Sequence, residues 1–205
     1  MITSKALSVV SLCFCLFSSQ ASELMDDAGD QNRARFIKLD GQGSPLIAQT
    51  PDGSWDCVLD RKTALLWEMK TTHGLRSRDN TYSWYNPDPL TNGGDAGVRN
   101  DGRCRESECD TMSYINAVNR LGLCGHRDWR LPAREELRSI VDYQRHSPQP
   151  TVDIDYFPNT LSQFYWSSTS EANAADSAWG IGFTFGYDYS YFKSDWGYIR
   201  LVTGG

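Results

Sequence analysis

Alternation of apolar and polar residues predicts a chain built largely from short β-strands. An edge strand is expected at 36–39, a hairpin near position 60, and an alternating segment near the C-terminus. In that segment Trp179, Ile181, Phe183 and Phe185 share one face. The expected strands comprise residues 36–39, 55–59, 64–70, 81–85, 165–169, 179–185 and 197–202, with a turn at 186–190.

Helical spacing predicts one clear helix before position 122. Asp110 or Thr111 can cap its start, Met112, Ile115 and Val118 share a face, and Gly122 can end it. This helix should therefore pack one apolar face against a core.

Residues 123–137, which we call the hub, connect that helix to a second helical pattern that extends to about Tyr143. Pro132 favours an extended residue before it and suits the first turn of a helix. Leu137, Ile140 and Val141 would share the buried face of that helix. We expect the charged hub residues to fix this connector by charge-assisted hydrogen bonds, and a ligand site there is the alternative. The hub residues of interest are Asp128, Trp129, Arg130, Pro132 and Glu136.

The first residues predict export from the cytoplasm. Lys5 precedes an apolar run at 6–17 and small residues at 18–22, as in a secretory signal peptide at 1–21. An uncleaved anchor is the alternative, but the run is short for a membrane span. We therefore expect an extracytoplasmic protein without a membrane span in its mature form. Its parts would be a tail and loop at 22–54 and a single domain at 55–205.

The cysteines and the charge support this interpretation. Removal of 1–21 leaves Cys57, Cys104, Cys109 and Cys124, an even count that favours two disulfides in an oxidising compartment. Of three possible pairings we favour Cys57–Cys124 and Cys104–Cys109, and a four-cysteine zinc site is the alternative. The net charge of −6 becomes −7 without Lys5, the only charged residue in the signal segment. This balance disfavours nucleic acid and anionic membrane surfaces as partners.

An ordered series of motifs resembles the C-terminal domain family of the Legionella collagen-like protein, also called domain of unknown function 1566. The hub motif Arg130-Leu131-Pro132 followed by Glu136 is also similar to its counterpart in sulfatase-modifying, C-type-lectin-like folds. The matching segments are 55–58 with Asp60 and Thr63, 66–68, 81–85, 109–111, Asn119 with 122–125, 128–132, 156–158, 165–168 and 200–202.

The resemblance implies an α+β domain in which two helices flank small antiparallel sheets, stapled by disulfides. This chain departs from the family pattern at Ala64, where glycine is usual, at Ala133, where threonine is usual, and at Thr203, where arginine is common. The family implies no general reaction. One member is a surface adhesin that binds sulfated polysaccharides, a ligand class that the acidic balance here disfavours.

Catalytic and metal-binding patterns are weak. His126, Asp128 and either Ser167 or Ser168 could form a hydrolytic site, but no Gly-x-Ser-x-Gly elbow is present. The histidines do not form a metal-binding pair, and Asp153 with its neighbours does not form an EF-hand loop. No catalytic residue, metal or cofactor is therefore predicted.

Aromatic residues near the expected turn suggest a binding site. Aromatic faces beside hydrogen-bonding groups suit sugar rings, and a rigid loop packed on itself is the alternative. We therefore predict a secreted or surface module that recognises a glycan or another surface polymer, and oligomerisation is compatible with this function. A cell-envelope hydrolase and a structural part of an envelope or pilus assembly are the alternatives. The candidate ligand-binding residues are Tyr187, Asp188, Tyr189, Tyr191, Asp195 and Trp196.

Overall fold

Two antiparallel sheets form the framework of this computed structural model, which describes residues 35–46 and 55–205. The predicted signal peptide and most of the acidic tail lie outside the described residues. One sheet has the order β1-β2-β3-β7 and the other has the order β4-β5-β6. The strands are β1 (Phe36–Leu39), β2 (Cys57–Asp60), β3 (Leu65–Glu68), β4 (Phe164–Glu171), β5 (Ala174–Gly182), β6 (Tyr187–Phe192) and β7 (Val202–Gly204).

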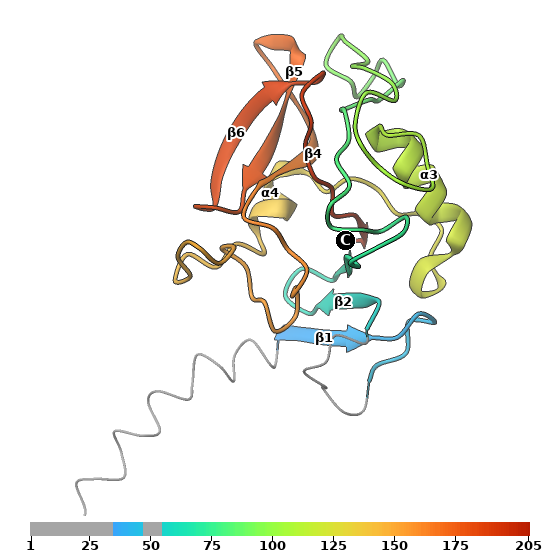
Figure 1. Cartoon of the computed structure of the whole chain (residues 1–205), viewed down its shortest axis with the longest axis vertical. Helices are drawn as coiled ribbons and strands as arrows, with labels where there is room; N and C mark the ends of the chain where they lie inside the picture. The colour runs from blue at the N-terminus through green and yellow to red at the C-terminus, as the bar shows by residue number, and fades with distance from the viewer. Residues whose placement is uncertain (1–34, 47–54) are drawn as a thin grey trace, which may run out of the picture. The chain divides into compact units, whose positions relative to one another are not determined.

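Within the described ranges, two short α-helices complete this α+β fold. They are α3 (Thr111–Leu121) and α4 (Arg134–Arg138), with a 3₁₀ segment (Leu123–Gly125) between them. In the view of Figure 1, α3 and the β4-β5-β6 sheet lie on opposite sides, and α4 lies beside that sheet. Among the described residues, no helix is both long and apolar enough to cross a bilayer.

The four-stranded sheet is buried on both faces. In β3, Leu65 and Trp67 belong to one apolar cluster with Phe157 and Ile181, whereas Leu66 belongs to a second cluster with Trp129. Since successive side chains of a strand face opposite sides, a strand between two cores must be apolar at consecutive positions. This explains why every residue of β3 is buried.

Strand β1 is the edge strand that the sequence predicts, and it pairs antiparallel with β2. Arg35, just before it, binds the buried carboxylate of Asp60 through two nitrogens at 2.9 and 2.6 Å. Burial alone would raise the pKa of Asp60, but hydrogen bonds from Arg35 and the Lys62 backbone, with the Arg35 charge, lower it. The compact unit accordingly begins at Arg35 and ends at Gly205.

Helix α3 has the predicted limits but a different buried face. Asp110 accepts a hydrogen bond from the Ser113 backbone at 2.8 Å, and Gly122 ends the helix with φ 67°. The prediction placed Met112, Ile115 and Val118 on the buried face. The fully buried residues are Thr111, Tyr114, Ala117 and Val118, so Val118 is buried as predicted, and Ile115 is partly buried against the second cluster. Tyr114 lies on the buried side of the helix, and its hydroxyl binds a buried carboxylate that is described below.

Helix α4 is much shorter than the predicted helix to about Tyr143. Backbone bridging between Val141 and Val152 draws the chain into an extended course directly after the helix. Leu137 and Ile140 are nevertheless buried, as expected. Ala133 offers no side-chain acceptor, but Glu136 accepts a hydrogen bond from the Ala133 backbone at 2.7 Å, which preserves half of a capping box.

Three predicted β-segments differ from the structure. Residues 81–85 form only single bridges, because Thr81, Tyr82 and Ser83 pair with three different segments of the chain. The predicted turn at 186–190 is wrong, since strand β6 occupies 187–192 and the turn precedes it. The final strand is Val202–Gly204 rather than 197–202.

Both favoured disulfides are present. Cys57–Cys124 joins β2 to the 3₁₀ segment, and Cys104–Cys109 closes a short loop. The hairpin turn between β2 and β3 places Ala64 at φ 59°, in the left-handed region that favours the glycine usual in the resembling family.

Candidate functional site

The aromatic residues near position 190 lie on a strand rather than on a turn. In β6, Tyr187, Tyr189 and Tyr191 occupy alternate positions and share one face, whereas Asp188 and Ser190 face the other side. The site is therefore built on a paired strand, which holds its side chains more rigidly than a loop tip would.

Two glycines of β5 give the aromatic rings room to lie over the sheet. Gly182 pairs with Tyr187 and Gly180 pairs with Tyr189 across the β5–β6 ladder. A Cβ atom on Gly182 would lie 2.6 Å from the Tyr189 ring, and one on Gly180 would lie 2.5 Å from the Phe164 ring. The alternation of glycine with apolar residues in β5 thus shapes one face of this sheet.

On this face lies a cavity of about 320 Å³, which we call the aromatic hollow. Tyr191 is 41% exposed and Trp196 is 46% exposed, so both rings are available to a ligand. The rings of Tyr189 and Tyr191 are stacked, with centroids 6.1 Å apart and planes inclined by 18°. The polar side chains of Gln163 and Thr184 also line the hollow. Its aromatic lining consists of Phe164, Phe185, Tyr189, Tyr191, Trp196 and Tyr198.

Only three of the six predicted ligand-binding residues, Tyr189, Tyr191 and Trp196, line the hollow. Tyr187 is exposed beside it and its ring lies 6.1 Å from that of Phe185.

The two acidic residues of the predicted set make contacts within the fold. Asp188 lies on the opposite face, where its carboxylate is 3.1 Å from Arg138 and 3.7 Å from Arg134. Asp195 accepts a hydrogen bond from the Phe192 backbone at 3.2 Å.

The sequence interpretation missed Phe164, Tyr198 and Gln163 as parts of this site. A signal for Phe164 was present, because it alternates with Trp166 in β4 and pairs with Gly182. Tyr198 lies outside the named strands, in a segment that bridges to Tyr82 through Gly197 and to Tyr165 through Tyr198, so its position depends on tertiary structure.

A second cavity of about 650 Å³, which we call the cationic hollow, has one lining residue in contact with a lining residue of the first. Its lining includes His73, Asp79, Arg103 and Arg105, together with the Cys104–Cys109 disulfide. The Arg103 guanidinium carbon lies 4.5 Å from the centre of the Trp196 ring. Because Trp196 lines the aromatic hollow, this stacked pair separates the two cavities.

The hub forms a bonded connector, as its residues suggest. Arg130 binds Glu136 through two nitrogens at 2.7 and 2.8 Å, and these hydrogen bonds lower the pKa of Glu136. Trp129 is buried and donates to the Leu123 carbonyl at 3.1 Å. Asp128 is exposed, and buried Pro132 accepts a hydrogen bond from the Ser168 backbone. These contacts connect the hub to β4.

The candidate hydrolytic residues do not form a hydrogen-bonded triad. Ser167 is fully buried and its hydroxyl donates to the Trp179 carbonyl at 2.7 Å. The Nδ1 atom of His126 lies 3.5 Å from Asp128, and both side chains are solvent-exposed. Among the described residues, no hydrogen bond links His126 to Ser167 or Ser168. The arrangement therefore lacks the serine–histidine contact that such catalysis uses.

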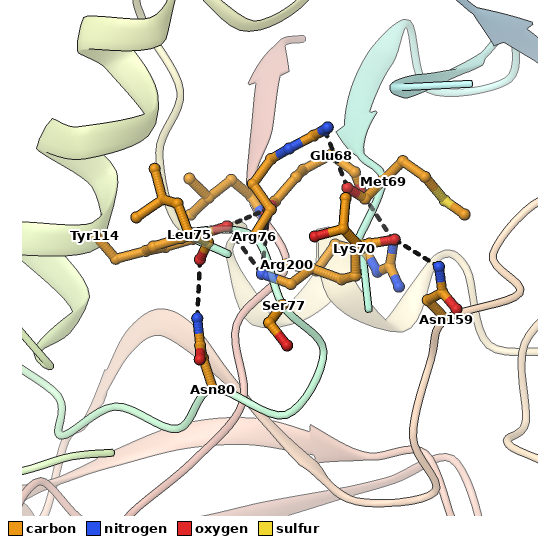
Figure 2. Close-up of polar contacts among 12 residues, drawn as sticks. Glu68, Met69, Lys70, Leu75, Arg76, Ser77, Asn80, Tyr114, Asn159 and Arg200 are labelled. Carbon is orange, nitrogen blue, oxygen red and sulfur yellow. Dashed lines mark hydrogen bonds and ion pairs between the residues drawn. The ribbon is translucent and has the colours of Figure 1, made fainter. Parts of the chain in front are cut away.

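A buried polar network centres on Glu68, which sequence reasoning did not single out (Figure 2). Its carboxylate binds the Lys70 ammonium at 3.1 Å, the Leu201 backbone at 3.0 Å and the Tyr114 hydroxyl. Arg200 donates to the Glu68 carbonyl at 2.7 Å. The side chains of Glu68, Tyr114 and Arg200 have no exposed surface.

This network connects β3, α3 and the C-terminal segment, and none of its four side chains lines either hollow. Burial lowers the pKa of Lys70 to about 8, against the opposing attraction of Glu68. Burial also raises the pKa of Tyr114 well above its ordinary value. Paired and desolvated ionisable groups without access for a ligand indicate a structural role.

Lys193 is another buried charged residue. Its ammonium donates to the carbonyls of Asn92, Asp95 and Ala175 at 2.7, 2.7 and 2.6 Å, and it lies 4.4 Å from the Trp84 ring centre. One side chain thus anchors the long loop at 86–97 to the β4-β5-β6 sheet.

No group of three or more His, Cys, Asp or Glu side chains is placed to hold a metal ion within residues 35–46 and 55–205. What the geometry offers chemically is an aromatic surface with polar edges beside a cavity that contains arginines. These features suit binding of a ligand through ring stacking and hydrogen bonds.

Comparisons with known proteins identify the family. The family model described as the Lcl C-terminal domain matches residues 56–203, which is most of the chain and includes both hollows and the hub. Comparison with curated proteins finds no match, and comparison with solved structures finds none either. The ordered motifs and the family match agree, and the chain belongs to the Lcl C-terminal domain family.

Proposed function

We propose that this protein is an extracellular binding module that recognises a glycan by stacking sugar rings in the aromatic hollow. The observation that carries the proposal is the exposure of Tyr191 and Trp196 at a cavity lined by four further aromatic side chains. A soluble protein normally buries such rings, so their clustering at a concave surface marks a site for an amphipathic ligand.

The polar edge of the hollow suits hydroxyl groups. Gln163 lines it, and its side-chain amide has no hydrogen-bond partner among the described residues, so it can donate to and accept from a sugar. The volume of about 320 Å³ lies at the lower end of the range of about 300–1,000 Å³ that is typical of small-ligand sites. The hollow can therefore hold a short stretch of a polymer rather than a whole chain.

A glycan array probed with the purified protein tests this proposal. Wild type should bind a restricted set of glycans, and a Tyr191→Ala/Trp196→Ala double variant should lose that binding. The lost stacking corresponds to about 1–3 kcal/mol, or roughly a 5-fold to 150-fold weaker Kd. An unchanged binding profile in the double variant would show that the hollow is not the site.

Phe192→Ala is the matched control. Phe192 is 59% exposed on the same strand, but its alternate position directs it away from the face that carries Tyr191. Its removal should leave glycan binding unchanged. Equal losses in both variants would indicate a general disturbance of β6 rather than a specific site.

An extracellular location is part of the proposal. It is supported by the two disulfides, which persist in oxidising compartments, and by membership of a family that suggests an extracellular module. The predicted signal peptide would direct this export. A C-type-lectin-like fold is consistent with two short helices beside small antiparallel sheets, and an experimental structure with bound sugar would test both ideas.

A further inference from the structure

One contact between two side chains links the lining of the cationic hollow to the lining of the aromatic hollow. Arg103 lines the cationic hollow and Trp196 lines the aromatic hollow, and the guanidinium carbon is 4.5 Å from the ring centre. The backbone holds them together, because Thr81 pairs with Arg103 while the next residue, Tyr82, pairs with Gly197. A polymer lying on Trp196 therefore has a short path into the second cavity.

The arginines of the cationic hollow have no acidic partner in the described part of the chain. Arg103 contacts the Trp196 ring, and Arg105 makes no side-chain hydrogen bond or ion pair with any described residue. Both side chains are exposed and flank Cys104, whose disulfide to Cys109 holds their loop. A guanidinium group presents paired donors that match a carboxylate, so two such groups at a cavity provide a site for an anion.

Resting on the proposed function, we propose that the ligand is a glycan that carries a carboxylated sugar next to the sugar that stacks on Trp196. The stacked ring occupies the aromatic hollow, and the neighbouring carboxylate enters the cationic hollow and binds Arg103 and Arg105. The Arg103–Trp196 pair sets the spacing between the two subsites.

The charges favour sparse carboxylates over a densely charged polymer. Asp79 also lines the cationic hollow, so the two arginines and this aspartate together carry a net charge of about +1. This charge can neutralise about one anionic group of a ligand. The chain as a whole carries a net charge of −6, which repels a ligand charged at every sugar. A polymer with one carboxylate per repeating unit meets both conditions.

Matched oligosaccharides test the proposal. Kd values of the purified protein would be measured for oligomers in which glucuronic, galacturonic or mannuronic acid alternates with a neutral sugar, and for their carboxyl-reduced, neutral counterparts. At least one acidic oligomer should bind about tenfold more tightly than its neutral counterpart, as expected for one charge-assisted contact. Arg105→Gln should remove that difference and leave the Kd of the neutral oligomer unchanged.

Arg120→Gln is the control for net charge. Arg120 is exposed on α3 and lines neither hollow, so its removal should not alter the preference for the acidic oligomer. If Arg120→Gln weakens acidic binding as much as Arg105→Gln does, the effect is long-range and the subsite is refuted.

The failures of the two proposals are distinguishable. Equal binding of acidic and neutral oligomers, lost in Tyr191→Ala/Trp196→Ala, would overturn the carboxylate subsite and retain the aromatic site. Binding of all oligomers that survives that double variant would overturn the proposed function itself. Tighter binding of dextran sulfate than of any uronate oligomer would overturn the choice of a sparse carboxylate ligand.

Discussion

Lys70 shows how a single buried residue couples the fold to pH. Its ammonium lies between Glu68 and the Tyr114 hydroxyl, at 3.1 and 2.8 Å, with little exposed surface. Burial lowers its folded-state pKa to about 8 from an ordinary value of 10.5. Between these values the unfolded chain binds more protons than the folded chain, so this residue makes stability increase with pH.

The buried tyrosines act in the opposite direction at higher pH. Burial raises the pKa of Tyr82, Tyr114 and Tyr165 above the ordinary value of 10.0. Above about pH 10 the unfolded chain loses phenolic protons that the folded chain keeps, so stability decreases.

We therefore predict that the free energy of unfolding increases by roughly 2–3 kcal/mol from pH 8 to about pH 10 and decreases above it. Urea denaturation at a series of pH values measures this profile. In Lys70→Met the increase should be smaller, because burial also lowers the pKa of Lys193 and that residue still contributes, and the decrease above pH 10 should remain. A wild-type stability that declines steadily from pH 8 upward would contradict the assigned direction for Lys70.

This network could not be predicted from sequence. Glu68 and Lys70 are two residues apart, and nothing in their spacing shows that Tyr114 and Arg200 meet them. The helical pattern even directed attention to Met112 and Ile115, because apolar periodicity does not register a tyrosine that buries its ring and binds a carboxylate. The left-handed φ of Ala64, in contrast, could be predicted, because the family resemblance implies glycine at this position.

In strands β5 and β6, alternate residues point to the same face of the sheet, and this alternation builds the site. The glycines of β5 leave space that rings from the flanking strands fill, and the tyrosines of β6 then share one exposed face. The alternation was readable in the sequence, but Gly186, Asp188 and Ser190 also resemble a turn, and this local turn chemistry misplaced the strand. The turn lies directly before β6, with Gly186 at φ 75°.

Gly182→Ala tests the role of this space. The new Cβ atom would lie 2.6 Å from the Tyr189 ring, so the ring must move and the hollow must change shape. We expect a loss of about 1–3 kcal/mol in the free energy of unfolding, as for an overpacked core. Glycan affinity should decrease as well. Denaturation and Kd measurements on the same preparations test both effects.

A double-mutant cycle provides the control. If the clash with Tyr189 causes the destabilisation, Gly182→Ala should cost little in a Tyr189→Ala background. An equal cost in both backgrounds would mean that the alanine disturbs the β5 backbone instead, and that the ring is not confined by the glycine.

At the scale of the whole molecule, two cores and the Cys57–Cys124 disulfide hold segments that are distant in sequence. The even cysteine count predicted two disulfides without fixing their pairing, and the family resemblance implied the α+β class. It did not predict that residues 81–85 would bond to separate segments, or that Tyr198 and Phe164 would meet at one cavity. Such contacts depend on how the sheets pack, which periodicity does not encode.

The two disulfides should contribute differently to this assembly. Cys57–Cys124 is buried and closes a separation of 67 residues, whereas Cys104–Cys109 is half-buried and closes only 5. In the loop-entropy relation these correspond to about 4 and about 2 kcal/mol of destabilisation of the unfolded chain. The long disulfide also connects β2 to the start of the hub, so its loss separates structural elements.

We therefore predict that Cys57→Ser lowers the free energy of unfolding by several kcal/mol, within the range of about 2–5 for a native disulfide, and leaves Cys124 as a free thiol. Cys104→Ser/Cys109→Ser should lower the free energy of unfolding distinctly less. This double variant should nevertheless bind carboxylated glycans more weakly, because Arg103 and Arg105 flank Cys104. Thermal melts, thiol mapping and Kd measurements distinguish the two variants. If both variants melt at the same temperature, the long disulfide does not dominate stability. If Cys104→Ser/Cys109→Ser binds acidic oligomers as tightly as wild type, the disulfide does not position Arg103 and Arg105.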